Sequence, residues 1–460
     1  MDLLLNLEAT PSRRAQLERQ LRDGIRSGRL RPGAPLPPSR ALARQLGISR
    51  GVVVDAYSQL VAEGYLTART GSGTRVADTV GAHSARPRSV VEATPAIRYD
   101  LRSGLPDVSS FPRRAWQSAT TRAMRELPDA WLQYGRPRGY SGLRVALTDY
   151  LARARATLAE PSRILICTGI SHGTALIWRT LRERGARRIG VEDPGWPGQS
   201  ESVRYAGLEP VPIRVDERGL VVTELEESDV DAVVVTPSHQ HPTGVVMAPE
   251  RRAALVQWVR KRDALIVEDD YDAEYRYDRD PVASLQGLAP EHVVYAGTAS
   301  KMLAPGLRLA WLVLPSTLVD DVTAQQLTIK ASPAVVDQAA LGYMIERGDL
   351  ERHLRQMRRH YRRRRDALME GLSRHLPDAR VGGAAAGLHL VAWLPETADE
   401  SGIAARARER GVAIHTLHGD CSAVAAVPPA LLLGYSLLPE DSLGRATEEL
   451  ALAVGLARRR

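Results

Sequence analysis

Lysine is scarce in this chain, and one lysine stands in a setting suited to chemistry. The 460 residues include 62 lysines and arginines, yet lysine occurs only at positions 261, 301 and 330. Arginine stays charged, whereas a desolvated lysine amine can lose its proton and condense with an aldehyde. Lys301 ends the turn Thr298-Ala-Ser-Lys301 between two apolar runs, and Arg308 follows seven residues later. We therefore predict that Lys301 forms a Schiff base and that Arg308 clamps a phosphate.

Acidic residues follow an apolar run upstream of this lysine. The segment Asp263-Ala-Leu-Ile-Val-Glu-Asp-Asp-Tyr271 is typical of a buried parallel strand that ends at the mouth of a sheet, where open α/β folds bind ligands. A carboxylate there can lie against a pyridinium nitrogen and keep it protonated. Asp269 is the candidate, with Asp270 as the alternative. Tyr271 is placed to reach the phenolic oxygen of such a ring.

Taken together, these residues resemble a known family. Residues 99–460 are similar to the fold-type I aminotransferase domain, which binds pyridoxal 5'-phosphate (PLP), and in particular to the aminotransferase-like half of the MocR/GabR regulators. The resemblance implies an α/β fold with a mostly parallel sheet of the seven-stranded type and a small C-terminal α/β subdomain from about residue 330. It also implies that Lys301 is the catalytic lysine that bonds to PLP.

Two further motifs are expected at the cofactor phosphate. Cys167-Thr-Gly-Ile-Ser171 joins a predicted strand at 164–166 to an apolar helix. A glycine turn at a helix N-terminus exposes backbone N–H groups and the positive end of the helix dipole, which suits a phosphate. Ile170, through its backbone, and Ser171 are therefore candidate ligands. We expect Thr298 and Ser300 to join Arg308 at the same phosphate.

The remaining cofactor contacts rest on the resemblance alone. Trp196, in Glu192-Asp-Pro-Gly-Trp196, stands where an aromatic residue lies on the face of the pyridine ring. Tyr134, in Tyr134-Gly-Arg-Pro-Arg-Gly-Tyr140, stands where a tyrosine reaches the phosphate of the neighbouring subunit, which implies a homodimer. Arg136 departs from the acidic residue that is usual in the MocR group.

Two positions differ from the enzymes of the family. His241 replaces the asparagine that precedes the Pro-Thr-Gly motif and bonds the ring oxygen; the histidine can still donate there, or it can only pack. Leu432 stands where enzymes and the GABA-responsive regulators have an arginine that holds the substrate α-carboxylate. Its presence weakens the case for ordinary amino-acid transamination and for GABA as effector. His239 and His241 have no third candidate ligand nearby, so we expect no metal site.

The positive charge of the chain is concentrated near its start. The net charge is +8, and residues 13–76 hold twelve arginines against four acidic residues, so the remainder of the chain is neutral overall. A small basic module attached to a neutral body is typical of a nucleic-acid reader that carries a sensor. A merely soluble, arginine-rich domain is the alternative.

Apolar spacing in this module predicts a winged helix-turn-helix. Leu17, Leu21 and Ile25 recur at helical intervals, which predicts a helix over 12–27. Ser39 is expected to cap a second helix and Ser49 a third. The inward face of the third helix is predicted to carry Val53, Ala56, Tyr57, Leu60 and Val61. Two short strands around Gly71-Ser-Gly73 complete the wing.

The module resembles the GntR family of DNA-binding domains. The resemblance rests on Leu36-Pro-Pro-Ser-Arg40, Ile48-Ser-Arg50 and the Gly-Ser-Gly-Thr wing, and it places the following residues at DNA: Arg40, Ser49, Arg50, Gly71, Ser72 and Gly73. The third helix should enter the major groove by its N-terminal end, and arginine to guanine is the commonest specific contact there. Gly51-Val-Val-Val54 offers no polar side chain beyond Arg50, so backbone, wing or thymine-methyl contacts must contribute more.

Length and composition set the remaining expectations. We expect a DNA-binding domain at 1–77, a flexible linker at 78–98 and the PLP-binding domain at 99–460. The longest apolar runs fall far below the ~18 residues of a membrane span. No signal peptide opens the chain, and its two cysteines, Cys167 and Cys421, imply no disulfide framework. We therefore expect a cytoplasmic protein without a membrane partner.

Three hypotheses follow for function. The favoured one is a PLP-dependent transcriptional regulator, a homodimer that binds double-stranded DNA at two half-sites and senses PLP or an amine or amino-acid adduct of PLP. The alternative is an active PLP-dependent aminotransferase with an appended DNA-binding domain, so the question of enzyme activity stays open. A regulator that no longer binds PLP is the third, and the preserved Lys301 argues against it.

Overall fold

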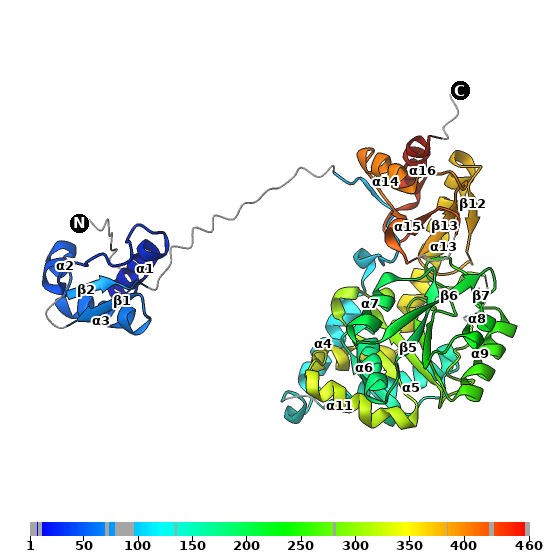
Figure 1. The fold of residues 1–460 in the computed structure, drawn as a ribbon, viewed down its shortest axis with the longest axis horizontal. Helices are drawn as coiled ribbons and strands as arrows, with labels where there is room; N and C mark the ends of the chain where they lie inside the picture. Colours follow the sequence, from blue (N-terminus) through cyan, green and yellow to red (C-terminus); the bar gives the residue numbers. More distant parts are fainter. Residues whose placement is uncertain are drawn as a thin grey trace. The chain divides into compact units, whose positions relative to one another are not determined.

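The computed structural model describes residue 7 and residues 12–69, 73–78, 96–133, 136–278, 282–383, 385–422 and 427–455. The chain divides into two compact units, Met1–Thr94 and Pro95–Arg460, each with its own hydrophobic core (Figure 1). Gly71, Ser72 and Tyr134 lie outside the described residues, as does most of the predicted linker at 78–98.

The described part of the N-terminal unit contains three helices and a two-stranded antiparallel sheet: α1 (Arg13–Arg26), α2 (Ser39–Leu46), α3 (Arg50–Ala62), β1 (Leu66–Arg69) and β2 (Gly73–Val76). Leu17, Leu21 and Ile25 of α1 are buried against α3. The predicted inward face of α3 is buried at Val53, Ala56, Tyr57 and Leu60 and half-buried at Val61. These elements confirm the predicted winged helix-turn-helix.

One of the two capping predictions in this unit is wrong. Ser49 caps α3, because its hydroxyl accepts a hydrogen bond from the backbone N–H of Val52 at 3.4 Å. Ser39 is instead the first residue of α2, and Pro38 occupies the cap position without a side-chain hydrogen bond. The ring of Pro38 fixes its φ, here −54°, so the chain is already extended one residue before the expected cap.

The larger unit is built on an eight-stranded sheet in the order β4-β11-β10-β9-β8-β5-β6-β7. Its strands are β4 (Ile164–Cys167), β5 (Arg188–Asp193), β6 (Glu209–Asp216), β7 (Gly219–Leu220), β8 (Ala232–Val235), β9 (Leu265–Asp270), β10 (Val293–Thr298) and β11 (Ala310–Val313). The five strands from β6 to β10 in this order are parallel, and β11 is antiparallel to both of its neighbours. Apart from the two-residue edge strand β7, the sheet is the mostly parallel, seven-stranded type that the sequence predicted.

Helices cover both faces of this sheet (Figure 1). One face packs against α6 (Ile170–Glu183), α7 (Pro197–Tyr205) and α11 (Val319–Ile329), and the other against α8 (Val222–Glu227) and α9 (Pro249–Arg262). Strand periodicity explains this arrangement, because successive side chains point to opposite faces. In β8, Ala232 and Val234 join the first core, whereas Val233 and Val235 join the second.

Further helices and a second sheet complete the unit. The helices are α4 (Arg113–Glu126), α5 (Ser141–Arg155), α10 (Ala299–Met302), α12 (Val335–Glu346), α13 (Asp349–His375), α14 (Glu400–Glu409), α15 (Leu417–Asp420) and α16 (Glu440–Val454), with short 3-10 turns η1 (Val108–Ser110), η2 (Asp129–Trp131), η3 (Pro161–Arg163), η4 (Pro305–Leu307) and η5 (Ser316–Leu318). The second sheet has the order β12 (Arg380–Gly382), β13 (His389–Trp393), β16 (Ala430–Gly434) and β15 (His415–Thr416). β3 (Tyr99–Asp100) pairs with β14 (Val412–Ala413), so the start of the unit is joined to its C-terminal part. Among the described residues, no helix combines the length and apolar character that crossing a membrane requires.

Candidate functional site

Five strands that run in the same direction bring the predicted site residues to one edge of the large sheet. β5, β8, β9 and β10 run in the same direction, and β4 shares it because β11 is antiparallel to both β10 and β4. The segments that follow these strands therefore meet at their carboxyl ends, the place where open α/β sheets bind ligands. Arg308 precedes the antiparallel β11 and so lies at the same edge.

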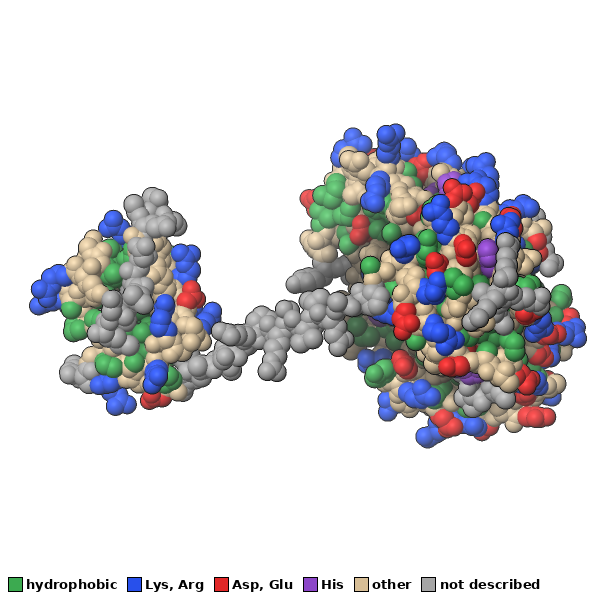
Figure 2. Space-filling view, turned by 90° about the horizontal axis from the view of Figure 1, so that it is seen from above, with side chains coloured by type: hydrophobic (Ala, Val, Ile, Leu, Met, Phe, Trp, Pro, Cys, Tyr) green, Lys and Arg blue, Asp and Glu red, His purple; other side chains and the backbone are tan. Residues whose placement is uncertain are grey.

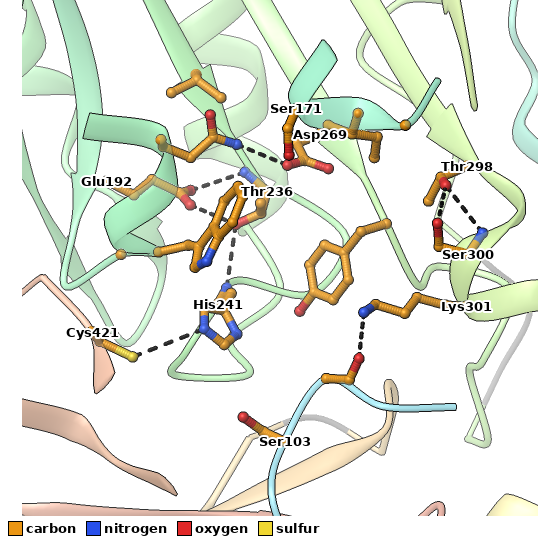
Figure 3. A pocket seen from close by; sticks show the side chains of 18 of the residues that line it. Ser103, Ser171, Glu192, Thr236, His241, Asp269, Thr298, Ser300, Lys301 and Cys421 are labelled. Atoms are coloured by element: carbon orange, nitrogen blue, oxygen red, sulfur yellow. Dashed lines mark hydrogen bonds between the residues drawn. The ribbon is translucent and has the colours of Figure 1, made fainter. Parts of the chain in front are cut away.

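A cavity of about 520 Å³ opens at this edge (Figure 3). Its lining includes every described residue that the sequence predicted for the cofactor: Ile170, Ser171, Trp196, His241, Asp269, Tyr271, Thr298, Ser300, Lys301 and Arg308. Residues that the sequence reasoning did not assign also line it, among them Ser103, Glu192, Gln199, Thr236, His415, Asp420 and Cys421. Leu432, singled out in the sequence, lies on the same wall.

Asp269 is the buried acid of the cavity. It is on the face of β9 that packs toward α6 and α7, since Val267, two residues earlier, belongs to that core. Its Oδ2 accepts a hydrogen bond from the Gln199 amide at 2.8 Å, and its buried Oδ1 has no hydrogen-bond partner among the described residues. Burial, with Asp270 and Glu192 nearby, raises the pKa of Asp269 to about 7. The free oxygen is suited to a positively charged N–H donor.

Asp270 lies on the opposite face of the same strand and is fully engaged there. The Arg155 guanidinium donates to both of its oxygens, at 2.7 Å to Oδ2 and 2.8 Å to Oδ1, and the Tyr295 hydroxyl donates to Oδ2 at 2.6 Å. Both partners of the ion pair are buried, with side chains 1% and 0% exposed. Asp270 therefore has a structural role, and Asp269 is the acid available to a ligand.

Glu192, near the end of β5, is a second acid of the cavity and is half-buried. The backbone N–H of Thr236 donates to its Oε1 at 3.1 Å, and the Gln240 amide donates to Oε2 at 3.2 Å. Burial raises the pKa of Glu192 to about 7. Its position directly after the apolar run 189–191 is the sequence signal that could have identified this residue. Gln199 carried a weaker signal, three residues after Trp196 in the first turn of a helix.

Lys301 reaches the cavity from α10, the short helix that follows β10. Its Nζ donates to the backbone carbonyl of Gly104, which belongs to the segment leading out of β3. Burial lowers the pKa of Lys301 from its usual value, while the nearby Asp272 and Asp269 oppose that shift. A lysine with a lowered pKa retains more of the neutral amine that can act as a nucleophile.

Arg308 and the turn before α6 lie together at one basic corner of the cavity. Arg308 has a left-handed backbone, with φ of 53°, and Gly169 has φ of 108°. A Cβ on Gly169 would lie 2.8 Å from Nη2 of Arg308, so only glycine admits the guanidinium so close to the N-terminus of α6. Thr298 caps α10 and donates to the Ser300 hydroxyl at 2.9 Å, and both residues line the same cavity.

The other residues that the sequence predicted at the ring also line the cavity. Trp196 is 44% exposed although it is large and apolar, and it lines the cavity. The Tyr271 hydroxyl donates to the backbone carbonyl of His239 at 3.1 Å. His241 lies 3.9 Å from the thiol of Cys421, measured from Nε2 to Sγ. Burial and the neighbouring His389 and His239 hold the pKa of His241 well below its usual value.

The N-terminal unit presents unpaired arginines where the sequence predicted DNA contacts. Arg40, near the start of α2, and Arg50, the first residue of α3, are exposed and form no ion pair within the described residues. Arg22, by contrast, is held by Glu63 at 2.7 Å. Basic side chains predominate on the visible face of this unit, whereas both signs are interspersed on the larger unit (Figure 2).

Both units of the chain match known protein families. Residues 100–430 match the aminotransferase class I and II family, and residues 13–76 match the bacterial regulatory proteins of the gntR family. The chain is 32% identical to the HTH-type pyridoxine biosynthesis transcriptional regulator PdxR of Corynebacterium glutamicum, over 99% of each chain. It is also 32% identical to the probable rhizopine catabolism regulatory protein MocR of Rhizobium meliloti, over 89% of this chain and 87% of that one.

Solved aminotransferases share the fold of the larger unit. The kynurenine aminotransferase of Pyrococcus horikoshii superposes with a TM-score of 0.71 at 26% identity, over 79% of this chain and 92% of that one. The multiple substrate aminotransferase of Thermococcus profundus gives 0.72 at 26% identity, over 80% and 93%. Together with the full-length regulators, these matches show that the chain belongs to the MocR/GabR type of transcriptional regulators, in which a GntR-family winged helix is fused to a fold-type I aminotransferase domain.

Proposed function

We propose that this regulator binds PLP in the cavity and that PLP, or an amine or amino-acid adduct of PLP, alters its binding to DNA. The observation that carries the proposal is the partnerless Oδ1 of Asp269, a buried oxygen that faces the same cavity as the Lys301 amine. Buried polar atoms are nearly always paired, so an unpaired carboxylate oxygen in a cavity is a place that suits a donor from a ligand. The pyridinium N–H of PLP is such a donor.

Each group of residues around the cavity would contact a different part of the cofactor. Asp269 would hold the ring nitrogen, Lys301 would bond to the aldehyde carbon, and Trp196 would cover the ring face. Arg308, the N-terminus of α6 with Ile170 and Ser171, and the hydroxyls of Thr298 and Ser300 would bind the phosphate. Tyr271 and His241 are the candidates for the phenolic oxygen. When bound, PLP supplies an electrophilic carbon that takes up amines.

The DNA-binding half of the proposal rests on the N-terminal unit. Arg50 would read a base in the major groove, with Arg40, Ser49 and the wing residue Gly73 close to the DNA. Val54 is 40% exposed on α3 and is suited to a thymine methyl group. We place the DNA-binding domain at 1–77, the linker at 78–98 and the PLP-binding domain at 99–460.

A homodimer is part of the proposal. Large apolar side chains are exposed along the first segment of the larger unit, on α4 and α5, and just after η2 between them: Leu105, Val108, Met124, Leu132 and Val145. We propose that these side chains contribute to the interface of the dimer. A dimer would also bring two winged helices to two DNA half-sites. The name of the C. glutamicum relative, a regulator of pyridoxine biosynthesis, supports PLP as a sensed ligand here.

An active aminotransferase is the second candidate function. The combination of Lys301 and Asp269 in one cavity favours it, because these groups would serve transamination as well as sensing. Leu432 counts against it, because a buried leucine cannot hold the α-carboxylate of an amino-acid substrate. Turnover of amino acids with a 2-oxo acid acceptor by the purified protein would support this candidate.

The cofactor proposal is tested by the visible colour of the purified protein. We expect a yellow wild type whose visible absorption band is abolished by Lys301→Ala, because the amine that bonds the cofactor is lost. Lys330→Ala is the matched control, since Lys330 is exposed and lies outside the cavity lining, and it should stay yellow. A colourless wild type that takes up no added PLP would contradict the proposal.

The DNA proposal is tested by an arginine pair on the N-terminal unit. Arg50→Ala should cost roughly 1–3 kcal/mol of binding and relax the preference at one base pair per half-site. Arg19→Ala is the matched control, an exposed arginine on α1. Equal losses on specific and unrelated DNA would reassign Arg50 to a phosphate contact.

A further inference from the structure

Few positively charged side chains line the cavity, so few are available to the part of a ligand that extends beyond the cofactor. Among the described residues that line it, Lys301 and Arg308 are the only lysine and arginine. Under the proposed function both are taken, the first by the aldehyde carbon of PLP and the second by its phosphate. Burial and neighbouring histidines keep the pKa of His241 well below its usual value, so this ring is neutral near pH 7.

The wall contributed by the C-terminal subdomain is apolar or already hydrogen-bonded. Leu432 of β16 is 1% exposed and packs with Val391, Leu417 and Cys421. His415 of β15 is its cross-strand neighbour, and the Nδ1 of His415 lies 3.0 Å from the Ser103 hydroxyl. Carboxylates in proteins are typically held by the fork of an arginine. No such fork lies on this wall within the described part of the chain.

Acidic groups add to this effect. Asp420, at the end of α15, is exposed and lines the cavity, and its Oδ2 accepts a hydrogen bond from the backbone N–H of Thr416 at 2.7 Å. Glu192 lines the cavity from the large sheet. A carboxylate entering beside Asp420 would lose water and meet negative rather than positive charge. An ammonium or an uncharged tail would not be penalised in this way.

We propose that the small-molecule effector of this regulator is a primary amine without a carboxylate, and that the wall formed by Leu432, His415 and Asp420 rejects amino acids. The proposal rests on the proposed function, because it concerns the space left beside bound PLP. It names the ligand class of the site and excludes the amino-acid part of the broader proposal.

Matched pairs of ligands test the proposal directly. The PLP-loaded, full-length protein would be titrated with L-phenylalanine and 2-phenylethylamine, and with L-lysine and 1,5-diaminopentane, each pair differing by one carboxylate. Calorimetry and the change in visible absorption both report binding, and neither requires turnover. We expect each amine to bind at least about tenfold more tightly than its amino acid, the size of effect that one charge-assisted hydrogen bond gives. Equal or tighter binding of the amino acids would overturn the proposal, as would the absence of binding by either amine.

Substitutions in the wall separate its effect from the intrinsic difference in reactivity between amines and amino acids, because that difference is the same in every variant. Leu432→Arg should shift the preference toward the amino acid by about tenfold, whereas Leu432→Met, which keeps the wall apolar, should leave it unchanged. Because Leu432 is buried, Asp420→Asn at the exposed position serves as a second variant, and a smaller shift of about threefold in the same direction is expected. Unchanged preference in a folded Leu432→Arg and in Asp420→Asn would contradict the assigned wall.

Failure of this inference can be distinguished from failure of the proposed function. A yellow protein that takes up amino acids as readily as amines retains PLP and loses only the ligand class. A colourless protein that takes up no PLP loses both. The ligand pairs and the colour therefore separate the two claims in one set of samples.

Discussion

Asp269 and Asp270 are adjacent on β9, yet they lie on opposite faces of that strand and differ in their hydrogen bonds. Asp270 faces a layer in which every oxygen of the carboxylate has a donor, from Arg155 and Tyr295. Asp269 faces the cavity with one oxygen bonded to Gln199 and the other without a partner. A buried acid that is completely paired maintains the fold, whereas a buried acid left incomplete is costly and persists where a ligand completes it.

Removing the paired acid should have the largest effect. Asp270→Ala leaves the guanidinium of Arg155 buried without its counter-charge, and breaking a buried pair in this way typically costs about 3–5 kcal/mol. Urea denaturation of the cofactor-free protein would measure the loss. The exposed Asp229 provides the control, and Asp229→Ala should change the free energy of unfolding by less than about 0.5 kcal/mol. Similar small losses for both variants would remove the structural role of Asp270.

Removing Asp269, the acid with an unpaired oxygen, should instead increase the free energy of unfolding of the cofactor-free protein. The pKa of Asp269 is raised to about 7 in the folded state, above the roughly 3.9 of an unfolded aspartate. The folded state therefore binds more protons than the unfolded state between these values, and the contribution of Asp269 to stability falls as pH rises through that window. Asp269→Asn should stabilise the cofactor-free protein by up to about 4 kcal/mol at pH 8 and by much less at pH 4.

The same substitution should weaken PLP binding, because the ring nitrogen loses its counter-charge. Denaturation at both pH values and a PLP titration would be measured on one preparation. A variant that is destabilised at pH 8, or that retains PLP as tightly as the wild type, would contradict the ligand-binding role of Asp269 that distinguishes it from Asp270.

The smallest expected effect concerns the one hydrogen bond that Asp269 does have. Gln199→Ala removes the donor at 2.8 Å and should weaken PLP binding by about 1 kcal/mol, roughly fivefold, because the carboxylate loses its orientation. Gln240→Ala would be unsuitable as a control, since that side chain also bonds Glu192 and Thr243. Ser202→Ala, on the same helix as Gln199 and outside the cavity lining, is suitable and should leave PLP affinity unchanged.

The sequence predicted much of this arrangement because the site is built from strand ends. Apolar runs followed by polar residues located β4, β9 and β10, and strands that run in the same direction bring their carboxyl ends together. Lys301 and Arg308 could be chosen by residue type, since few side chains perform their chemistry. The helix boundaries of the N-terminal unit were equally accessible, except at Ser39, where Pro38 shifted the cap by one position.

What the sequence could not decide depended on the packing of distant segments. The choice between Asp269 and Asp270 requires knowing which face of β9 is covered by α7 and which by Arg155 of α5. Gln199 and Ser103 reach the cavity from α7 and from the segment after β3, and neither residue type is diagnostic. The raised pKa values of Glu192 and Asp269 arise from burial and mutual proximity, which no local pattern reveals.

The measurement that tests the central claim most directly is DNA binding as a function of half-site spacing, with and without PLP. DNA from the region around its own gene would be used in gel shifts, with the two half-sites moved apart by about half a helical turn or a full turn, roughly 5 or 10 base pairs. A dimeric regulator should lose more affinity with the half turn, and PLP should alter that dependence in the wild type but not in Lys301→Ala. Binding without sequence preference, or a spacing dependence identical with and without PLP, would contradict a PLP-responsive regulator.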